Sequence, residues 1–436
     1  MEQHKTRDSG SERAVIVSND THIGPRLVED LRPYCPANHL DEFDRFAATV
    51  AEQQEATAKL LGGSGYLDHP NLRTLGHYDP AARLADYDYD GIAAGVIFHG
   101  SMNMEPIPFV EASLSKFGSA RTIERDLVGV GMQIYNRWLA DFVSQAPHRH
   151  IGLAQVPIWD LETTIAEVEW SHDAGLRGVN FPAMRDDDLP EYNKRVWEPL
   201  WSVCEERSMP LVTHVGGTFN TKYSGLESVA LVQIESNYVS RRAVWWLIFA
   251  GVFERHPGLK YVVTETPGNW FPPTAVELDS IHGFYQLKRD QPLNAKLLEQ
   301  IPRRPSEYMM NNVFFGASFA SPFEVEQAML HGLDSQLLWG SDYPHFESTF
   351  VHRDVRDMPS VGRLALRNTF CDVPAEKTRR MIGENAIGVY DLDAVALQQI
   401  ADEIGAPTYE ELATPIDAVP ADANIPAFRS GAGAWS

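Results

Sequence analysis

The sequence predicts a (β/α)8 barrel. Eight short apolar runs recur along the chain, helical patterns separate them, and polar residues follow the carboxyl ends of several runs. The runs are continuously apolar rather than alternating, as expected of parallel strands covered on both faces. In such a barrel the active site lies at the carboxyl ends of the strands, which is where the polar residues gather here.

The predicted strands are short and rich in branched apolar residues. They cover residues 15–17 running into 18–22, then 95–99, 151–158, 176–181, 210–214, 259–265, 313–317 and 336–342. The segments between them have helical periodicity. These predicted helices cover residues 121–145, 161–173, 192–206, 229–254, 273–289 and 323–331, with another at 374–390 after the last strand.

An open, doubly wound sheet is the alternative fold. That fold would need a glycine-rich phosphate-binding loop directly after its first strand. The sequence has Asp20-Thr21-His22 in that place. The barrel is therefore the preferred prediction.

We expect three segments: a polar N-terminal segment at 1–14, the barrel at 15–390 and a tail at 391–436. Within the barrel, residues 24–90 form a long insertion over the active-site mouth. It contains a polar helix at 40–61, a glycine hinge at 62–65 and an Asp/Tyr-rich turn at 86–90. Long loops on this face usually shape the substrate pocket.

The tail is rich in alanine, proline and acidic residues, with eight carboxylates against a single arginine. Partial disorder is one expectation. The other is packing on the barrel or on a neighbouring subunit. Its apolar anchors for such packing are Ile416, Val419, Ile425, Phe428 and Trp435.

Composition excludes several classes of protein. The chain has 37 Lys+Arg against 60 Asp+Glu, a formal charge of −23, and no basic run, so nucleic acid is not an expected partner. The polar N-terminus lacks the apolar core of a secretory signal, and no stretch is apolar enough to span a membrane. We expect a cytoplasmic protein with a small-molecule substrate. Three scattered cysteines fit neither a disulfide framework nor a CxxC metal site.

Four residues at predicted strand ends have the side chains of metal ligands. Asp20 and His22 lie two apart, so in an extended chain both point to the same side. His214 ends the fifth strand, and Asp342 ends the eighth. Two imidazoles and two carboxylates suit one divalent ion, with zinc as first choice and manganese or iron as alternatives.

Each of these residues alone is weak evidence, because a histidine at a strand end is more often structural than a ligand. The coincidence at three strands makes the metal interpretation the stronger one.

Five motifs resemble one family. They are Ser18-Asn-Asp-Thr-His22, Leu211-Val-Thr-His214-Val-Gly, the segment from Phe253 to Glu265, Gly340-Ser-Asp342-Tyr-Pro-His345 and Ile382-Gly-Glu-Asn-Ala386. The chain resembles the amidohydrolase superfamily, in the metal-dependent branch that includes aminocarboxymuconate-semialdehyde decarboxylase and the γ-resorcylate decarboxylases. The resemblance implies that the metal ligands are Asp20, His22, His214 and Asp342.

The sequence departs from the family pattern in two places. Many members have His-x-His or Glu-x-His where this chain has Asp20-Thr-His22. The decarboxylases carry a catalytic histidine at the end of strand six, where this chain has Glu265. Glu265 fits a ligand, a general base or a carboxylate that orients a metal-bound histidine. Binuclear members bridge two metals with a strand-four lysine, whereas this strand carries Asn180. One metal is therefore expected.

The leading functional hypothesis is a mononuclear metal-dependent hydrolase of a small cyclic or aromatic molecule. Asp342 would take the proton of a metal-bound water, Glu265 or a pocket histidine would assist the leaving group, and His214 would hold the metal. The alternatives are a non-oxidative decarboxylase of a hydroxybenzoate-type acid and a cyclase of secondary metabolism that uses the same site. A non-catalytic barrel is the least favoured hypothesis.

Further residues are expected around the site. His99 ends the second strand, His345 follows Asp342 and Trp270 follows Glu265. We expect these three side chains to contact substrate, with a structural role as the alternative for each histidine. A homodimer or higher homo-oligomer is expected from the family resemblance.

Overall fold

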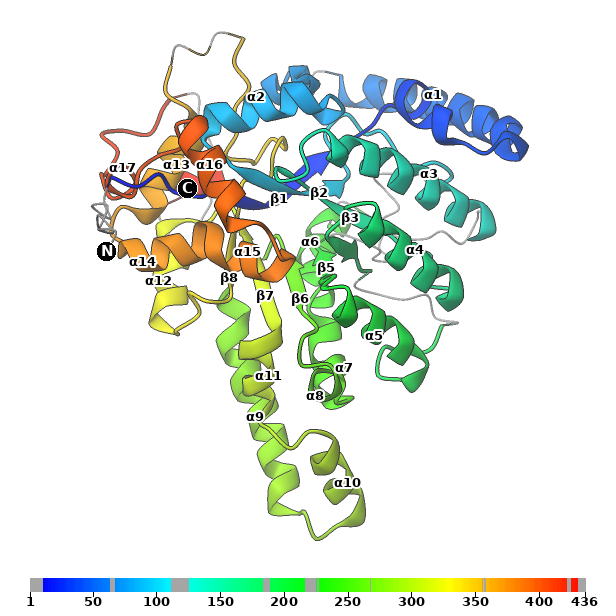
Figure 1. Cartoon of the computed structure of the whole chain (residues 1–436), viewed down its shortest axis with the longest axis vertical. Helices are drawn as coiled ribbons and strands as arrows, with labels where there is room; N and C mark the ends of the chain where they lie inside the picture. Colours follow the sequence, from blue (N-terminus) through cyan, green and yellow to red (C-terminus); the bar gives the residue numbers. More distant parts are fainter. Residues whose placement is uncertain are drawn as a thin grey trace, which may run out of the picture.

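A computed structural model of the chain describes residues 11–429, apart from 63–66, 111–124, 183–188, 216–224, 226, 267, 355, 357 and 422–424. Eight parallel strands form one sheet in chain order, and helices alternate with them as in a (β/α)8 barrel (Figure 1). The predicted fold class is confirmed. The strands are β1 (Val17–Ile23), β2 (Ala94–His99), β3 (His150–Gln155), β4 (Gly178–Asn180), β5 (Leu211–His214), β6 (Tyr261–Thr264), β7 (Val313–Ser318) and β8 (Leu337–Gly340).

The barrel closes between β8 and β1 just beyond the end of β8. Thr21 and Tyr343 form a parallel bridge. The Asp342 backbone N–H donates to the Asp20 carbonyl at 2.9 Å, and the His22 N–H donates to the Tyr343 carbonyl at 2.5 Å. The closure therefore runs directly through the predicted metal ligands.

Helices surround the strands, and most predicted helices appear at their expected places. Their bounds are α1 (Leu40–Leu61), α2 (Pro80–Asp90), α3 (Arg125–Ser144), α4 (Leu161–Asp173), α5 (Glu198–Glu206), α6 (Ser228–Val239), α7 (Arg242–Phe249), α8 (Val252–Arg255), α9 (Phe271–Leu287), α10 (Pro292–Gln300), α11 (Pro305–Asn312), α12 (Pro322–Leu330), α13 (Val361–Phe370), α14 (Ala375–Arg379), α15 (Asn385–Tyr390), α16 (Ala394–Glu403) and α17 (Tyr409–Leu412). A π-helical turn, Arg380–Glu384, joins α14 to α15. Figure 1 shows α9 and α10 extending away from the strands.

Two local predictions are wrong. The expected turn at 86–90 is the end of α2, because Asp79 accepts a hydrogen bond from the Ala82 N–H, Pro80 opens the helix, and Gly91 ends it with φ +79°. The expected helix at 229–254 is three helices. Its last break lies at Gly251, whose φ of +67° is left-handed.

Strand β1 covers the polar part of the predicted first strand, residues 18–22, and starts two residues later than the predicted apolar run at 15–17. Its pairing with β2 continues to Ile23, opposite His99. Asp20 and His22 therefore lie within the strand, where polar residues are accommodated because their side chains point into the barrel and toward one another.

The tail packs on its own barrel within the described residues. Leu397 belongs to the core cluster beside β2 and β3, and Tyr409 and Leu412 belong to the largest core cluster. Ile425 packs with Val361 of α13. Val419 is exposed, and Trp435 lies outside the described residues, as does most of the expected glycine hinge. Among the described helices, none is long and apolar enough to cross a membrane.

Candidate metal centre

Strand β1 carries the first two candidate ligands, Asp20 and His22. The pairing of β1 with β2 shifts register between Ser18 and Thr21, which places a bulge at residues 19–20. On the other side of β1, a Cβ atom added to Gly340 would come within 2.8 Å of the Asp20 Cβ. Glycine at this position of β8 therefore allows the backbone to pass close to Asp20.

His214 and Asp342 come from the opposite wall and from the closing seam of the barrel. His214 is the last residue of β5, and its Nδ1 lies 2.6 Å from the Val215 carbonyl oxygen. Because a carbonyl oxygen only accepts, Nδ1 carries the proton, and Nε2 of the neutral ring keeps its lone pair for a ligand. Asp342 follows β8 with a left-handed φ of +58°. Such a conformation in a non-glycine residue is typical of functional sites.

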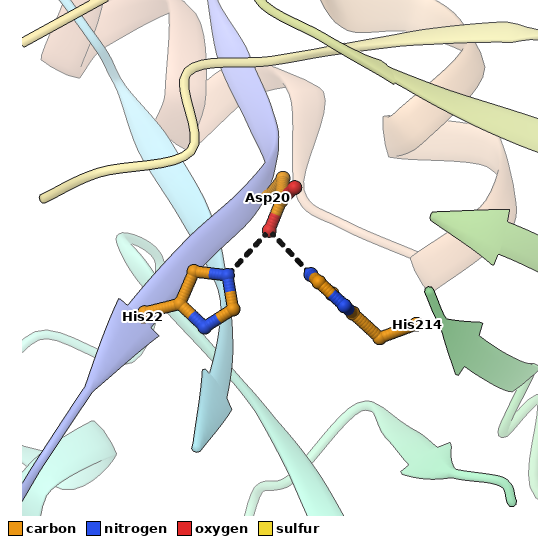
Figure 2. Close-up of side chains that lie close together, drawn as sticks. All are labelled: Asp20, His22 and His214. Carbon is orange, nitrogen blue, oxygen red and sulfur yellow. Dashed lines mark ion pairs between the residues drawn. The ribbon is translucent and has the colours of Figure 1, made fainter. Parts of the chain in front are cut away.

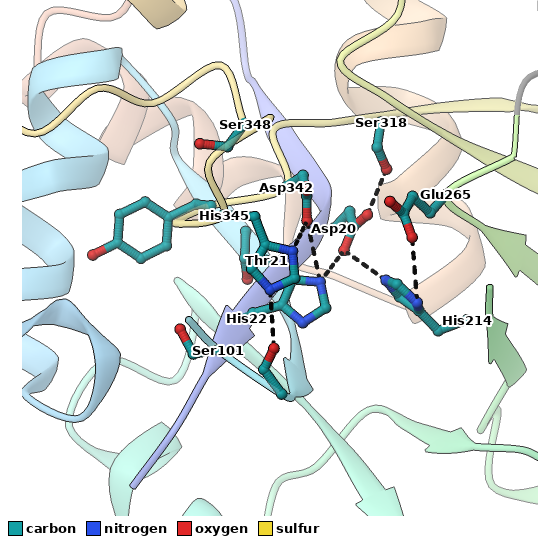
Figure 3. Close-up of polar contacts among 12 residues, drawn as sticks. Asp20, Thr21, His22, Ser101, His214, Glu265, Ser318, Asp342, His345 and Ser348 are labelled. Atoms are coloured by element: carbon teal, nitrogen blue, oxygen red, sulfur yellow. Dashed lines mark hydrogen bonds and ion pairs between the residues drawn. The ribbon is translucent and has the colours of Figure 1, made fainter. Parts of the chain in front are cut away.

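The four side chains converge on one point: Figure 2 shows Asp20, His22 and His214, and Figure 3 shows them together with Asp342. The His22 Nε2 atom lies 3.1 Å from Asp20 Oδ1 and 3.2 Å from Asp342 Oδ1. The His214 Nε2 atom lies 3.4 Å from the same Asp20 oxygen. The structure thus brings together all four sequence-predicted metal ligands.

The converging atoms are buried and lack ordinary partners. Asp20 and Asp342 are fully buried, and His22 is 3% exposed. Within the described residues, Asp20 Oδ1, both His22 nitrogens, His214 Nε2 and both Asp342 oxygens have no hydrogen bond. Buried polar atoms without partners are costly. A divalent cation would satisfy them, so the donor set fits a metal ion.

The electrostatics of the site also favour a cation. Burial raises the pKa of Asp20, but attraction from His214 and His22 outweighs it and holds the Asp20 pKa well below its usual range. Burial lowers the pKa of His214, yet Asp20 and Glu265 raise it to about 9. The surroundings of His214 are therefore strongly negative, and they stabilise positive charge.

Glu265 lies beside His214, directly after β6 (Figure 3). Its Oε2 atom is 3.7 Å from His214 Nδ1, and its φ is +59°. Burial raises the pKa of Glu265 to about 8, with further upward effects from Asp342 and Asp20. The structure places Glu265 at the centre, as predicted.

Glu347 is a site residue that the sequence analysis missed. One carboxylate oxygen of each of Glu265, Asp342 and Glu347 lies within 4.8 Å of the others. Burial and the charge of Asp342 raise the pKa of Glu347 to about 7. The available signal was its position only five residues after Asp342 in the strand-eight motif.

His345 lies on the side of His22 away from His214 (Figure 3). Its ring stacks on the His22 ring with centroids 3.9 Å apart, its Nδ1 lies 3.0 Å from Asp342 Oδ1, and its Nε2 lies 2.9 Å from the Gly100 carbonyl oxygen. Burial lowers the His345 pKa, but Asp342 and other acceptors raise it to about 10. His345 is thus a protonated ring that contacts two candidate ligands.

His99 is the last residue of β2, and Trp270 ends the 3-10 turn that follows β6. The His99 ring packs edge-on against Tyr135, and burial lowers its pKa to about 4, so the ring is neutral. Trp270 is 4% exposed, with the Arg241 guanidinium 5.5 Å from its ring centre. Neither belongs to the metal-ligand sets among the described residues. Substrate contact by these residues and by His345 stays a prediction.

Comparison with known proteins identifies the family. A family model described as "Amidohydrolase" matches residues 102–392. The chain belongs to the amidohydrolase family. No curated protein matches the chain.

Solved structures of amidohydrolase-type proteins share the fold. A 5-carboxyvanillate decarboxylase from Novosphingobium aromaticivorans with bound manganese superposes with a TM-score of 0.56 at 17% identity, covering 88% of this chain and 98% of that chain. A dihydroxybenzoic acid decarboxylase from Polaromonas sp., also with manganese, gives 0.54 at 16%, covering 88% and 99%. An amidohydrolase from Mycobacterium avium subsp. paratuberculosis gives 0.55 at 19%, covering 76% of each chain. At these identities the similarity establishes the fold of this family member.

Proposed function

We propose that this amidohydrolase-family protein is a metal-dependent, non-oxidative decarboxylase of a small aromatic hydroxy acid. The observation that carries the proposal is the convergence of unpartnered buried donors from Asp20, His22, His214 and Asp342. Support comes from the decarboxylases among the solved structures of the same fold. This reverses the order of the sequence-based hypotheses, in which hydrolysis came first.

The metal we propose is manganese, with zinc and iron as alternatives. Two similar decarboxylase structures contain manganese. Two carboxylates and two imidazoles are compatible with all three ions. When bound, the cation would anchor the substrate carboxylate and its neighbouring hydroxyl oxygen and withdraw electron density from the ring.

Decarboxylation needs a proton at the ring carbon that loses carbon dioxide. The bond between ring and carboxylate breaks, its electron pair stays on the ring carbon, and that carbon takes one proton. Glu265 stands where decarboxylases of the resembled branch carry a histidine, so the proton must have another source. We assign the proton transfer to Asp342 and its resupply to His345, whose Nδ1 lies 3.0 Å from the Asp342 carboxylate.

Hydrolysis is the second candidate function. The carboxylate of Asp342 would accept a proton from an attacking water. Hydrolysis would need the same bound cation as decarboxylation. The observation that favours hydrolysis is Glu265, which departs from the decarboxylase pattern at the end of β6.

The test measures carbon dioxide release by the manganese-loaded full-length protein. Carboxyl-13C-labelled 2-hydroxy- and 2,6-dihydroxybenzoates would be incubated in deuterium oxide. We expect 13CO2 and one deuterium at the vacated ring carbon, and about a thousandfold slower reaction for Asp342→Asn. Turnover of amides or lactones in the same preparation, without carbon dioxide from any acid, would favour hydrolysis and overturn the proposal.

A further inference from the structure

Two sets of ligand-type side chains meet at Asp342. The first holds the four ligands described above. The second consists of Glu265 after β6 and Glu347 after β8, which share the 4.8 Å cluster with Asp342. The second set contains only carboxylates, and it lies beside the first rather than in it.

The Asp342 carboxylate has more acceptor capacity than the first set uses. Its Oδ1 atom faces His22 Nε2 at 3.2 Å and His345 Nδ1 at 3.0 Å. Its Oδ2 atom is fully buried and has neither a hydrogen bond nor an ion pair among the described residues. The Glu347 Oε2 atom is likewise buried without a hydrogen bond. Two buried oxygens in one carboxylate cluster therefore lack the donor that burial normally requires.

The charges of the site also favour a second cation. Asp20, Glu265, Asp342 and Glu347 form no ion pair with lysine or arginine within the described part of the chain. The ion-pair partners of the first three there are histidines. These four carboxylates therefore lack a lysine or arginine counter-charge among the described residues, and a second cation would supply one.

We propose that the protein binds two divalent cations, the second held by Glu265, Glu347 and Asp342, with Asp342 bridging the two sites. The proposal rests on the proposed metal centre and changes the expectation of a single metal, which came from the absence of a strand-four lysine. An all-oxygen ligand set suits magnesium, calcium or manganese at the second site. Glu265 is then a metal ligand, not the base or the orienting group that its position also allows. Because both Asp342 oxygens then face cations, the proton of the proposed decarboxylation comes from His345 directly and not through Asp342.

The competing arrangement is a pair of carboxyl groups that share a proton. A protonated Glu265 or Glu347 would lower the negative charge without a cation. That arrangement predicts one metal per chain, and so the metal count separates the two.

The experiment measures bound manganese per chain by elemental analysis after metal-free full-length protein is loaded with Mn²⁺ and free metal is removed. We expect two per chain in the natural protein and one in Glu347→Gln. The exposed Glu299→Gln on α10 is the matched control and should retain two. Electron paramagnetic resonance should show a coupled manganese pair in the natural protein and an isolated ion in Glu347→Gln.

Each result has a distinct meaning. One manganese per chain in the natural protein, unchanged in Glu347→Gln, overturns the second site and leaves the proposed function standing. No bound manganese overturns the proposed function itself. If Glu347→Gln does not fold, as judged by its thermal transition, Glu265→Gln takes its place with the same expected loss of one ion.

Discussion

The two sides of the metal centre are supported differently. The ligands on β1 and β8 lie on a seam of buried hydrogen bonds, in which the fully buried Arg83 donates to the His22 carbonyl at 2.7 Å and to Thr21 Oγ1 at 2.6 Å. Across the barrel, β5 is supported at Thr213, whose hydroxyl donates to the Phe181 carbonyl at 2.8 Å. We infer that the seam positions the candidate ligands of β1 and Asp342, and that His214 on β5 adds the remaining one.

Further bonds on the seam join β1 to β7 and to the residue after β8. The Ser18 hydroxyl accepts from the Ser341 N–H at 2.9 Å, and the Ser318 hydroxyl donates to Asp20 Oδ2 at 2.5 Å. Arg83 also donates to Tyr87 and lies 4.8 Å from the Tyr343 ring centre. The insertion after β1 supplies Arg83 and Tyr87, and so it supports the metal ligands from outside the barrel.

The largest expected effect comes from Arg83→Met. The substitution removes a buried cation together with its hydrogen bonds to the His22 carbonyl and the Thr21 hydroxyl. We expect the free energy of unfolding to fall by about 3–5 kcal/mol in urea denaturation. Thr213→Val on the β5 side should cost only about 1 kcal/mol.

Metal binding distinguishes positioning from stability in the same variants. Arg83→Met should weaken Mn²⁺ binding measured by calorimetry at a temperature where the variant is folded, whereas Thr213→Val should not. Arg73→Met, which removes an exposed ion pair with Asp354, is the control. Equal stability losses in Arg83→Met and Thr213→Val would contradict the proposed difference between the two sides.

The sequence predicted that the four candidate ligands would lie together because each lies in or after a barrel strand near its carboxyl end, and these ends share one face of a parallel barrel. It did not predict the role of Arg83, since the contact between Arg83 and His22 joins residues 61 positions apart and depends on how α2 packs. Glu347 was missed for a related reason: the direction of the loop after β8 follows from the left-handed backbone at Asp342, which no periodicity indicates.

The α2 helix shows where composition misleads. Aspartate and tyrosine at 86–90 are typical of turns, but the signals at the two ends of the segment, Asp79-Pro80 and Gly91, are those of a helix. Long-range packing then buries Asp86 and Tyr87 against the seam. End signals were more informative here than the residues between them.

The next prediction concerns pH and His77, which belongs to the seam side. The His77 ring contacts Ser101 and the Asn71 carbonyl, and burial lowers its pKa from 6.5 to about 4. The unfolded chain therefore binds a proton between pH 6.5 and 4 that the folded chain does not. The contribution of His77 to the free energy of unfolding should be fully present above pH 6.5. It should fall by about 3 kcal/mol as the pH drops toward 4.

His77→Gln tests this contribution in metal-free protein. The pH dependence of the urea midpoint between pH 6.5 and 4 should become shallower in His77→Gln than in the natural chain. Some slope should remain, because burial also lowers the pKa of His99 to about 4 and that of His150 to about 3. An exposed replacement, His148→Gln, is the control. An unchanged slope in His77→Gln would show that His77 takes up its proton equally in both states.

The smallest expected effect comes from Ser318→Ala. This variant tests whether a side-chain contact or the backbone orients Asp20. Ser318 contacts Asp20 through the oxygen that does not face His22, so its hydroxyl fixes the rotation of the carboxylate without approaching a cation. Loss of such a supporting hydrogen bond typically weakens metal affinity by 10–100-fold. We expect about tenfold weaker Mn²⁺ binding by calorimetry, with a stability loss of about 1 kcal/mol, and no change in the exposed control Ser335→Ala. Unchanged affinity in Ser318→Ala would mean that the backbone bonds between β1 and β8 orient Asp20 without help from its side-chain partner, and the seam would then act through the main chain alone.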